Sequence, residues 1–161
     1  MDKISTHLWF DGEAEQAADF YTGLFPDSHI ASITYAPTDY PSGKAGDVLQ
    51  IAFTLGGRSF LALNGGPSFP FTEAISLSID CRDQEEVDRY WEALSAHPEN
   101  EQCGWVKDRF GLSWQIIPRA LPELLADPDR AKAKRAMDAM MTMKKINIAV
   151  LQAAAKAETT S

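Results

Sequence analysis

Several features that mark special classes of protein are missing from the 161 residues of this chain. It has only two cysteines, Cys81 and Cys103, far apart and outside any CxxC, so neither a disulfide framework nor a zinc site is indicated. No apolar run approaches the ~20 residues that cross a bilayer, which argues against a membrane-spanning helix. Residues 1–4 lack the basic and apolar regions of a signal peptide. We therefore expect a cytoplasmic protein with reduced thiols.

Positive charge is scarce too, since 15 Lys and Arg residues stand against 23 Asp and Glu residues, a formal net charge of −8. Residues 119–161 hold eight basic and five acidic residues, so residues 1–118 carry −11. An acidic body repels phosphate backbones, and we expect no nucleic-acid partner. The basic cluster at 130–135 is typical of the solvated face of a helix.

An internal repeat organises a chain of otherwise ordinary globular composition. Phe10-Asp11 and the helical segment 18–21 recur 69 positions later as Ile79-Asp80 and 87–90. The segment 57–60 recurs at 111–114, an offset of 54. Two matches in the same order indicate a duplication whose second copy has a connector shorter by 15 residues.

Hydrophobic periodicity predicts the same order of elements in both copies, a strand, a helix and three strands. The first copy has strands at 4–10, 29–35, 48–55 and 59–63, a helix at 12–25 and a mobile loop at 36–46. The second has strands at 74–79, near Glu101, at 105–108 and at 113–117, with a helix at 83–94. Helices at 121–125, 131–143 and 146–157 follow. The prediction is an α+β domain of two βαβββ modules, about 1–66 and 67–118, with a helical C-terminal extension, 119–161, in the same domain.

Alternation along the strands separates two faces of the expected sheets. One face is apolar throughout: Leu8, Phe10, Phe60, Ala62, Leu77, Ile79, Trp114 and Ile116. The opposite face is mixed: His7, Trp9, Ser59, Leu61, Leu63, Ser76, Ser78, Ser113 and Gln115. Large apolar groups with a few polar ones are typical of a ligand pocket. A solvated face covered by a dimer partner is the alternative.

Several segments make the chain resemble the PhnB-like proteins, often labelled 3-demethylubiquinone-9 3-methyltransferase. They are residues 8–15, 20–21, 24–28, 63–67, 102–105, 107–115 and 121–128. The family belongs with the glyoxalase, bleomycin-resistance and dioxygenase proteins of the vicinal-oxygen-chelate superfamily. The resemblance implies paired βαβββ modules with cavities inside curved sheets, assembled as homodimers. Methyl transfer is not expected, because the sequence contains no GxGxG or GxGxxG turn.

The resemblance also implies where a metal would bind, on the first and last strands of each module. The repeat places His7, Leu61, Ser76 and Gln115 there, and Ser68 stands where relatives often carry a His. One imidazole, one amide, one hydroxyl and a leucine do not supply the three or four donors that a divalent ion needs. We therefore expect no metal and no cofactor.

Two classes of function remain open. One is a metal-independent protein that binds a small molecule, with His7, Trp9, Leu61, Ser76 and Gln115 lining the site. The other is a glyoxalase-like or dioxygenase-like enzyme acting on a small oxygenated substrate. His7 is either a hydrogen-bonded structural imidazole or an acid-base group, since only His titrates near neutral pH when unperturbed.

Overall fold

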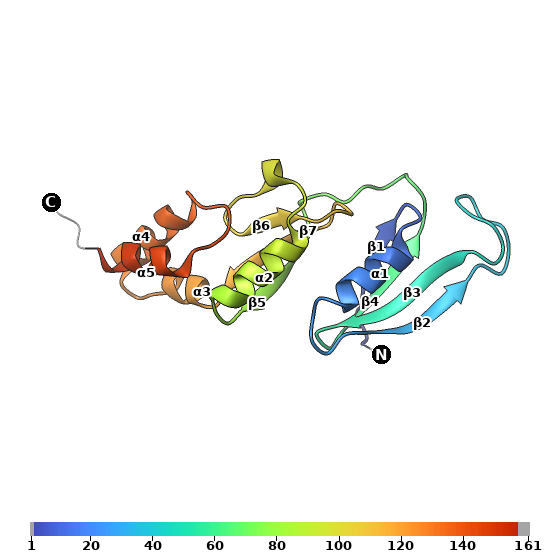
Figure 1. Ribbon diagram of the computed structural model, residues 1–161, viewed down its shortest axis with the longest axis horizontal. Helices are drawn as coiled ribbons and strands as arrows, with labels where there is room; N and C mark the ends of the chain where they lie inside the picture. Colours follow the sequence, from blue (N-terminus) through green and yellow to red (C-terminus); the bar gives the residue numbers. More distant parts are fainter. Residues whose placement is uncertain (1, 158–161) are drawn as a thin grey trace. The chain divides into compact units, whose positions relative to one another are not determined.

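The chain forms two compact units, Met1–Phe71 and Thr72–Ser161, in a computed structural model that describes residues 2–157 (Figure 1). The first unit contains β1 (Thr6–Phe10), α1 (Ala14–Thr22), β2 (His29–Tyr35), β3 (Val48–Leu55) and β4 (Arg58–Asn64). Its sheet has the order β1-β4-β3-β2, in which β1 and β4 are parallel and the other neighbours are antiparallel. This is the predicted βαβββ module.

Glycines in the left-handed region set the ends of two elements in the first unit. Gly56 and Gly57, with φ of 53° and 80°, form the two-residue turn of the β3–β4 hairpin. Gly12, with φ of 78°, separates β1 from α1, so the helix starts at Ala14 rather than at the predicted residue 12. The N–H of Ala14 donates to Asn64 Oδ1 at 2.9 Å, which fastens the start of the helix to the end of β4.

The second unit begins with β5 (Ser76–Cys81), α2 (Gln84–Leu94), the 3₁₀ turn η1 (Pro98–Asn100), β6 (Trp105–Lys107) and β7 (Ser113–Pro118). Its sheet has the order β5-β7-β6, with β5 and β7 parallel. The α+β architecture of paired modules is confirmed.

The predicted strand near Glu101 is wrong within the described residues. Gln102 forms a single bridge with Trp105 across a tight turn whose middle residues, Cys103 and Gly104, have φ of 53° and 86°. Pro98, whose ring fixes φ and removes a donor, starts the 3₁₀ turn just before it. The chain between α2 and β6 therefore forms turns in place of the predicted strand, and the second sheet has three strands.

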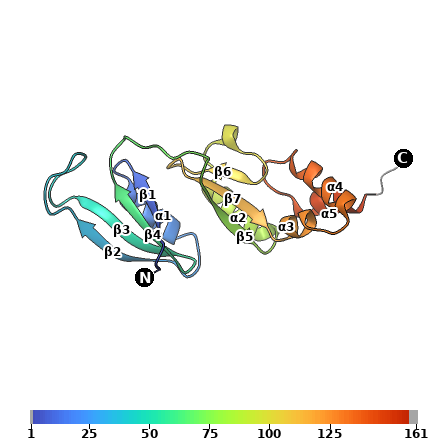
Figure 2. The ribbon, with the colours of Figure 1, turned by 180° about the vertical axis from the view of Figure 1, so that it is seen from behind.

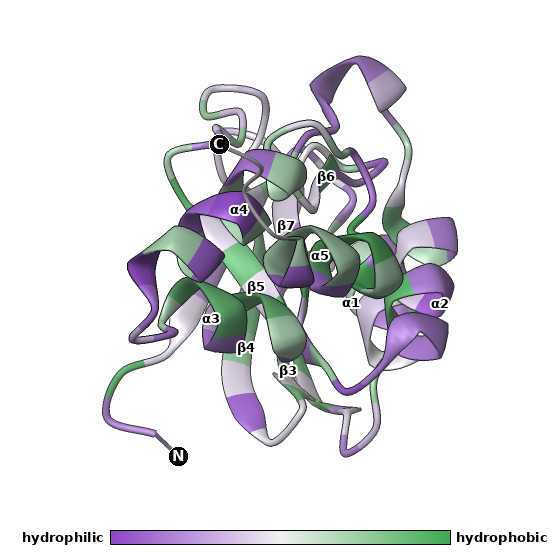
Figure 3. Ribbon diagram, turned by 90° about the vertical axis from the view of Figure 1, so that its left-hand side faces the viewer, coloured by the Kyte–Doolittle hydropathy of each residue, from purple (hydrophilic) through white to green (hydrophobic). Residues whose placement is uncertain are grey.

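Each sheet has one face covered by the helix of its own module (Figures 1 and 2). The helix-facing side chains are those predicted from alternation, and most of them are buried, including Leu8, Phe10, Ala62, Ile79, Trp114 and Ile116. The helices bury one side and expose the other; Figure 3 shows polar residues along the outer side of α2. We call the opposite side of each sheet its open face.

The C-terminal extension forms α3 (Ala120–Leu125), α4 (Arg130–Met140) and α5 (Ile148–Lys156). Leu121, Ile146 and Leu151 make a buried cluster, against which Ile117 of β7 packs. Met140 and Met143 pack against this cluster, whereas Met137 and Met141 are exposed. Among residues 2–157, no helix is long and apolar enough to span a membrane.

Candidate functional site

The open face of the first sheet carries three of the predicted site residues. His7 and Trp9 alternate with the buried Leu8 and Phe10 on β1. The parallel register of β1 and β4 places Leu61 directly opposite His7. The imidazole of His7 is exposed, while Trp9 and Leu61 are half-buried. The structure therefore brings His7, Trp9 and Leu61 together on one surface.

Trp9 is held from several sides. Its indole N–H donates to the carbonyl of Gly66 at 2.8 Å. Its ring meets Phe69 edge-on, with ring centroids 4.9 Å apart and an interplanar angle of 74°. The backbone at Gly65 lies so close to the indole that an added Cβ would overlap Cε2 of Trp9. The polar end of Trp9 is thus occupied within the fold, and Gly65 and Phe69 pack against its ring.

The open face of the second sheet carries the other two predicted residues. The amide of Gln115 donates to the hydroxyl of Ser76 at 2.9 Å, so these two side chains are joined. Trp105 lies opposite Gln115 in the register of β6 and β7 and is half-buried. An aromatic ring, an amide and a hydroxyl therefore share this face.

The register corrects the repeat alignment by two residues. His7 pairs with Leu61 in the first sheet, whereas the residue that pairs with Gln115 is Ser78, not Ser76. A shift of two residues keeps each side chain on the same face. The position equivalent to His7 is therefore a serine by either alignment.

The motif at 107–115 proves to have a structural role that the sequence did not reveal. Asp108 is fully buried, and its Oδ1 accepts hydrogen bonds from the N–H groups of Phe110 and Leu112 at 2.8 and 3.1 Å. Its Oδ2 accepts from the indole N–H of Trp114 at 2.8 Å. This carboxylate organises the turn between β6 and β7.

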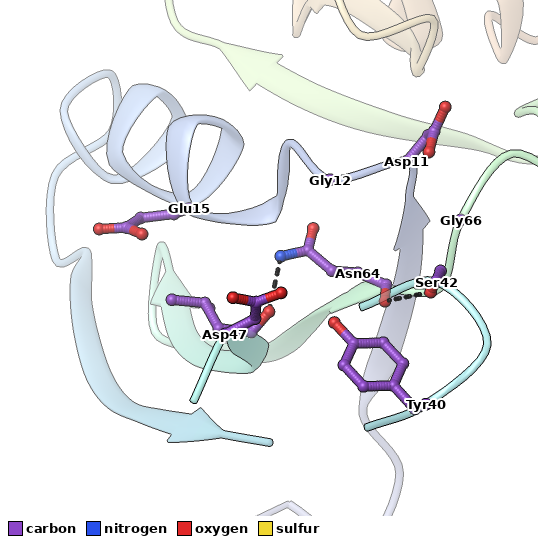
Figure 4. A pocket seen from close by; sticks show the side chains of 9 residues that line it. Asp11, Gly12, Glu15, Tyr40, Ser42, Asp47, Asn64 and Gly66 are labelled. Carbon is purple, nitrogen blue, oxygen red and sulfur yellow. Dashed lines mark hydrogen bonds between the residues drawn. The ribbon is translucent and has the colours of Figure 1, made fainter. Parts of the chain in front are cut away.

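A pocket of about 260 Å³ lies in the first unit, apart from the predicted residues. The loop between β2 and β3, the start of α1 and the end of β4 frame it (Figure 4): Asp11, Gly12, Glu15, Tyr40, Ser42, Asp47, Val48, Asn64 and Gly66. The loop is tied down, since Ser42 Oγ donates to the carbonyl of Asn64 and the N–H of Ala45 donates to Asp39 Oδ1. The sequence predicts a mobile loop at 36–46 and gives no sign of this hollow, although Asn64 belongs to the segment 63–67 that carries the family resemblance.

The pocket is acidic, yet its carboxylates do not converge. Figure 4 shows Asp11 and Glu15 pointing away from Asp47. The amide of Asn64 is already engaged, because Oδ1 accepts from the N–H of Ala14 and Nδ2 donates to the carbonyl of Val48 at 2.9 Å. Within the described part of the chain, His, Cys, Asp and Glu side chains nowhere gather in a group of three that could hold a metal ion.

The metal that the sequence resemblance implies does not fit the residues at its expected positions. Leu61, opposite His7, has no donor atom, and the amide of Gln115 is hydrogen-bonded to Ser76. His7 alone offers a good ligand atom.

Cys81 has no nucleophilic character. It is fully buried at the end of β5, and this burial raises the pKa of the thiol from 9.0 to about 12, with Glu86 and Asp80 adding to the effect. The thiol therefore keeps its proton in the folded protein, whereas the unfolded chain loses it above about pH 9. The resulting contribution to stability is complete below that pH and is lost as the pH rises toward 12.

We expect this pH dependence of the free energy of unfolding to disappear in Cys81→Ala. Between about pH 8 and about pH 10.5, the free energy of unfolding should fall more steeply in the wild type than in this variant. Urea denaturation at both pH values measures the difference. Cys103→Ala, which removes the other, half-buried thiol, is the matched control. An identical pH profile for the wild type and Cys81→Ala would contradict the assignment.

Comparison with known proteins places the chain among relatives. A family model described as 3-demethylubiquinone-9 3-methyltransferase matches residues 2–117. A PhnB protein from Bacillus cereus, described in the same terms, is 36% identical, with 73% of this chain and 99% of that chain covered and a TM-score of 0.61. Protein PA1353 from Pseudomonas aeruginosa shares the fold at 20% identity and a TM-score of 0.51, with 73% and 98% covered. No curated protein matches the chain significantly.

The family match ends at residue 117, and about a quarter of this chain has no counterpart in the Bacillus cereus protein. The extension formed by α3, α4 and α5 lies beyond the matched residues, so the resemblance expected for residues 121–128 is not part of the family match. The shared part contains the four-stranded module, the three-stranded module and the segments that hold Trp9 and Asp108 in place. This chain belongs to the PhnB-like family, whose family model carries the name 3-demethylubiquinone-9 3-methyltransferase.

Proposed function

We propose that the chain is a metal-independent small-molecule-binding protein that uses the open faces of its two sheets. The observation that carries the proposal is the composition of these faces. His7, Trp9 and Leu61 share one, and Ser76, Trp105 and Gln115 share the other. Each combines an aromatic ring with one or two polar groups, as ligand sites do.

The ligand class follows from these side chains and the charge of the chain. Residues 1–118 carry −11, so a cation is attracted to the body of the molecule. Trp9 and Trp105 offer ring faces on which a planar or cationic group can stack. We therefore propose a planar aromatic ligand, with a cationic one favoured.

Methyl transfer by the usual S-adenosylmethionine site is not supported. Such a site needs a glycine-rich turn between a strand and a helix. The paired glycines of this chain serve other purposes, since Gly56-Gly57 turns a hairpin and the N–H groups of Gly65 and Gly66 both donate to the carbonyl of Phe10. The family name is therefore not a guide to the activity proposed for this chain.

A thermal-shift screen tests the proposal. Planar aromatic cations and neutral aromatic compounds are added with and without divalent metals. A ligand at 100 times its dissociation constant should stabilise the fold by about 2.7 kcal/mol, which raises Tm by several degrees. Trp9→Leu or Gln115→Leu should reduce the shift, whereas Trp91→Leu on α2 should not.

The same screen can reject the proposal. If no aromatic compound shifts Tm, the open faces are not the binding site of such a ligand. If a divalent metal alone produces the shift and turnover of a dicarbonyl or a catechol follows, the enzyme alternative replaces binding.

We further propose a homodimer. Open sheets leave strand edges that need a partner, and in the first unit β2 is an edge strand with no charged residue. Light scattering at micromolar concentration should give twice the 17.8 kDa mass of the chain. A monomeric mass would refute the dimer.

A further inference from the structure

The C-terminal extension reaches back to the turn that precedes β6. The N–H of Cys103 donates to the carbonyl of Met143, and the N–H of Gly104 donates to the carbonyl of Lys144, both at 2.8 Å. Lys144 Nζ also donates to the carbonyl of Pro98 at 2.9 Å. Both middle residues of the turn are therefore bonded to residues 143–144, about 40 positions further along the chain. We call residues 143–146 the clamp.

The clamp is itself anchored on α2. The side chain of Gln84 donates to the carbonyl of Ile146 at 3.0 Å and accepts from the N–H of Ile148 at 2.9 Å. Lys145 pairs with Asp88 of the same helix at 2.9 Å. Ile146 is fully buried between these contacts. One amide side chain thus bonds the backbone on both sides of Asn147, at the last residue of the clamp and at the first residue of α5.

The clamped turn adjoins the open face of the second sheet. Gly104 directly precedes Trp105, and its carbonyl accepts from the N–H of Ile116 at 2.7 Å. An added Cβ at Gly104 would lie 3.1 Å from side-chain atoms of both Ile117 and Ile146. Ile117 shares the open face with Gln115, two residues away. The clamp, the turn and the end of β7 are therefore packed together beside Trp105 and Gln115.

We propose that the extension is a positioning device for this face. By bonding to the turn at Cys103 and Gly104, the clamp fixes where β6 begins and so holds Trp105 opposite Gln115. The clamp lies beyond the residues that the family model matches, so this positioning of the turn is an addition to the shared fold. Its consequence for binding rests on the proposed function, whereas the clamping itself does not.

The experiment uses the full chain and needs no ligand. Gln84→Ala removes the anchor of the clamp, and Gln152→Ala, the same change at an exposed position of α5, is the matched control. Amide hydrogen exchange is measured at Cys103 and Gly104, and fluorine NMR on 5-fluorotryptophan protein follows the four indoles. Lys145→Ala, at an exposed ion pair, serves as a milder second variant if Gln84→Ala folds poorly.

In Gln84→Ala we expect exchange at Cys103 and Gly104 to be about tenfold faster or more, because the bonds to the clamp open locally. The Trp105 resonance should shift or broaden while that of Trp9 stays in place. Gln152→Ala should leave both readouts unchanged.

Three results would overturn the proposal. One is unchanged exchange at Cys103 and Gly104. Another is faster exchange there with an unmoved Trp105 resonance, which makes the clamp a stabilising contact only. The third is a uniform loss of protection with all four indoles shifted, which makes the extension part of one cooperative core. All three are independent of the ligand screen, so the clamp and the binding function can fail separately.

Discussion

Asp108→Ala should lower the free energy of unfolding by about 3–5 kcal/mol. The carboxylate is fully buried and accepts from the N–H groups of Phe110 and Leu112 and from the indole of Trp114. Truncation leaves these donors without that acceptor, and the donors on Leu112 and Trp114 lie in buried hydrogen bonds. Urea denaturation followed by circular dichroism measures the loss.

Two further variants separate the bonds of Asp108. Asp108→Asn keeps an oxygen for the backbone donors and loses the acceptor for Trp114, so an intermediate loss is expected. Asp138→Ala removes an exposed carboxylate that pairs with Lys134 on α4, and it should change stability by no more than about 0.5 kcal/mol. A loss below about 1 kcal/mol in Asp108→Ala would show that the turn does not depend on this side chain.

Gly65→Ala should lower the free energy of unfolding by about 2–4 kcal/mol and displace the side chain of Trp9. The added Cβ would overlap the indole ring, so either the ring or the backbone must shift. Displacement of the ring breaks the hydrogen bond from the indole to the carbonyl of Gly66 and disturbs the edge-on contact with Phe69. Chemical denaturation gives the energy, and tryptophan fluorescence reports the displacement.

Two controls isolate the overlap. Gly23→Ala, at a right-handed position with φ of −77° and ordinary contacts, should cost little or even stabilise. In a Trp9→Leu background, Gly65→Ala should cost much less, because the ring it strikes is gone. If Gly65→Ala lowers the free energy of unfolding equally in both backgrounds, the need for glycine at position 65 does not come from its close approach to Trp9.

Hydrophobic periodicity predicted the elements of the modules apart from the strand near Glu101, because it reports which side of an element meets the core. His7 and Trp9 alternate with Leu8 and Phe10 in the sequence, and the structure buries the second pair and leaves the first on the open face. The Gly56-Gly57 pair likewise suits the turn of the β3–β4 hairpin, since a left-handed turn favours glycine wherever it occurs. These are local properties.

Pairings between distant segments were beyond the reach of the sequence. The register that places Ser78 opposite Gln115 depends on how two strands almost 40 residues apart slide against each other. A repeat offset fixes the face but not this register, because a shift of two residues preserves the alternation. The strand predicted near Glu101 failed for a related reason, since a turn at Cys103 and Gly104 used the residues that a strand would need.

The sequence by itself determined the α+β class, the duplicated module, the two faces of each sheet and the poor set of metal donors at His7, Leu61, Ser76 and Gln115. Only the tertiary structure decided that Asp108 is buried, that Trp9 is fixed by Gly66 and that residues 143–146 hold the turn before β6. The physical reason is the same in each case. Composition and spacing report the average environment of a side chain, whereas a hydrogen bond between distant residues depends on where the packing of the whole unit brings donor and acceptor together.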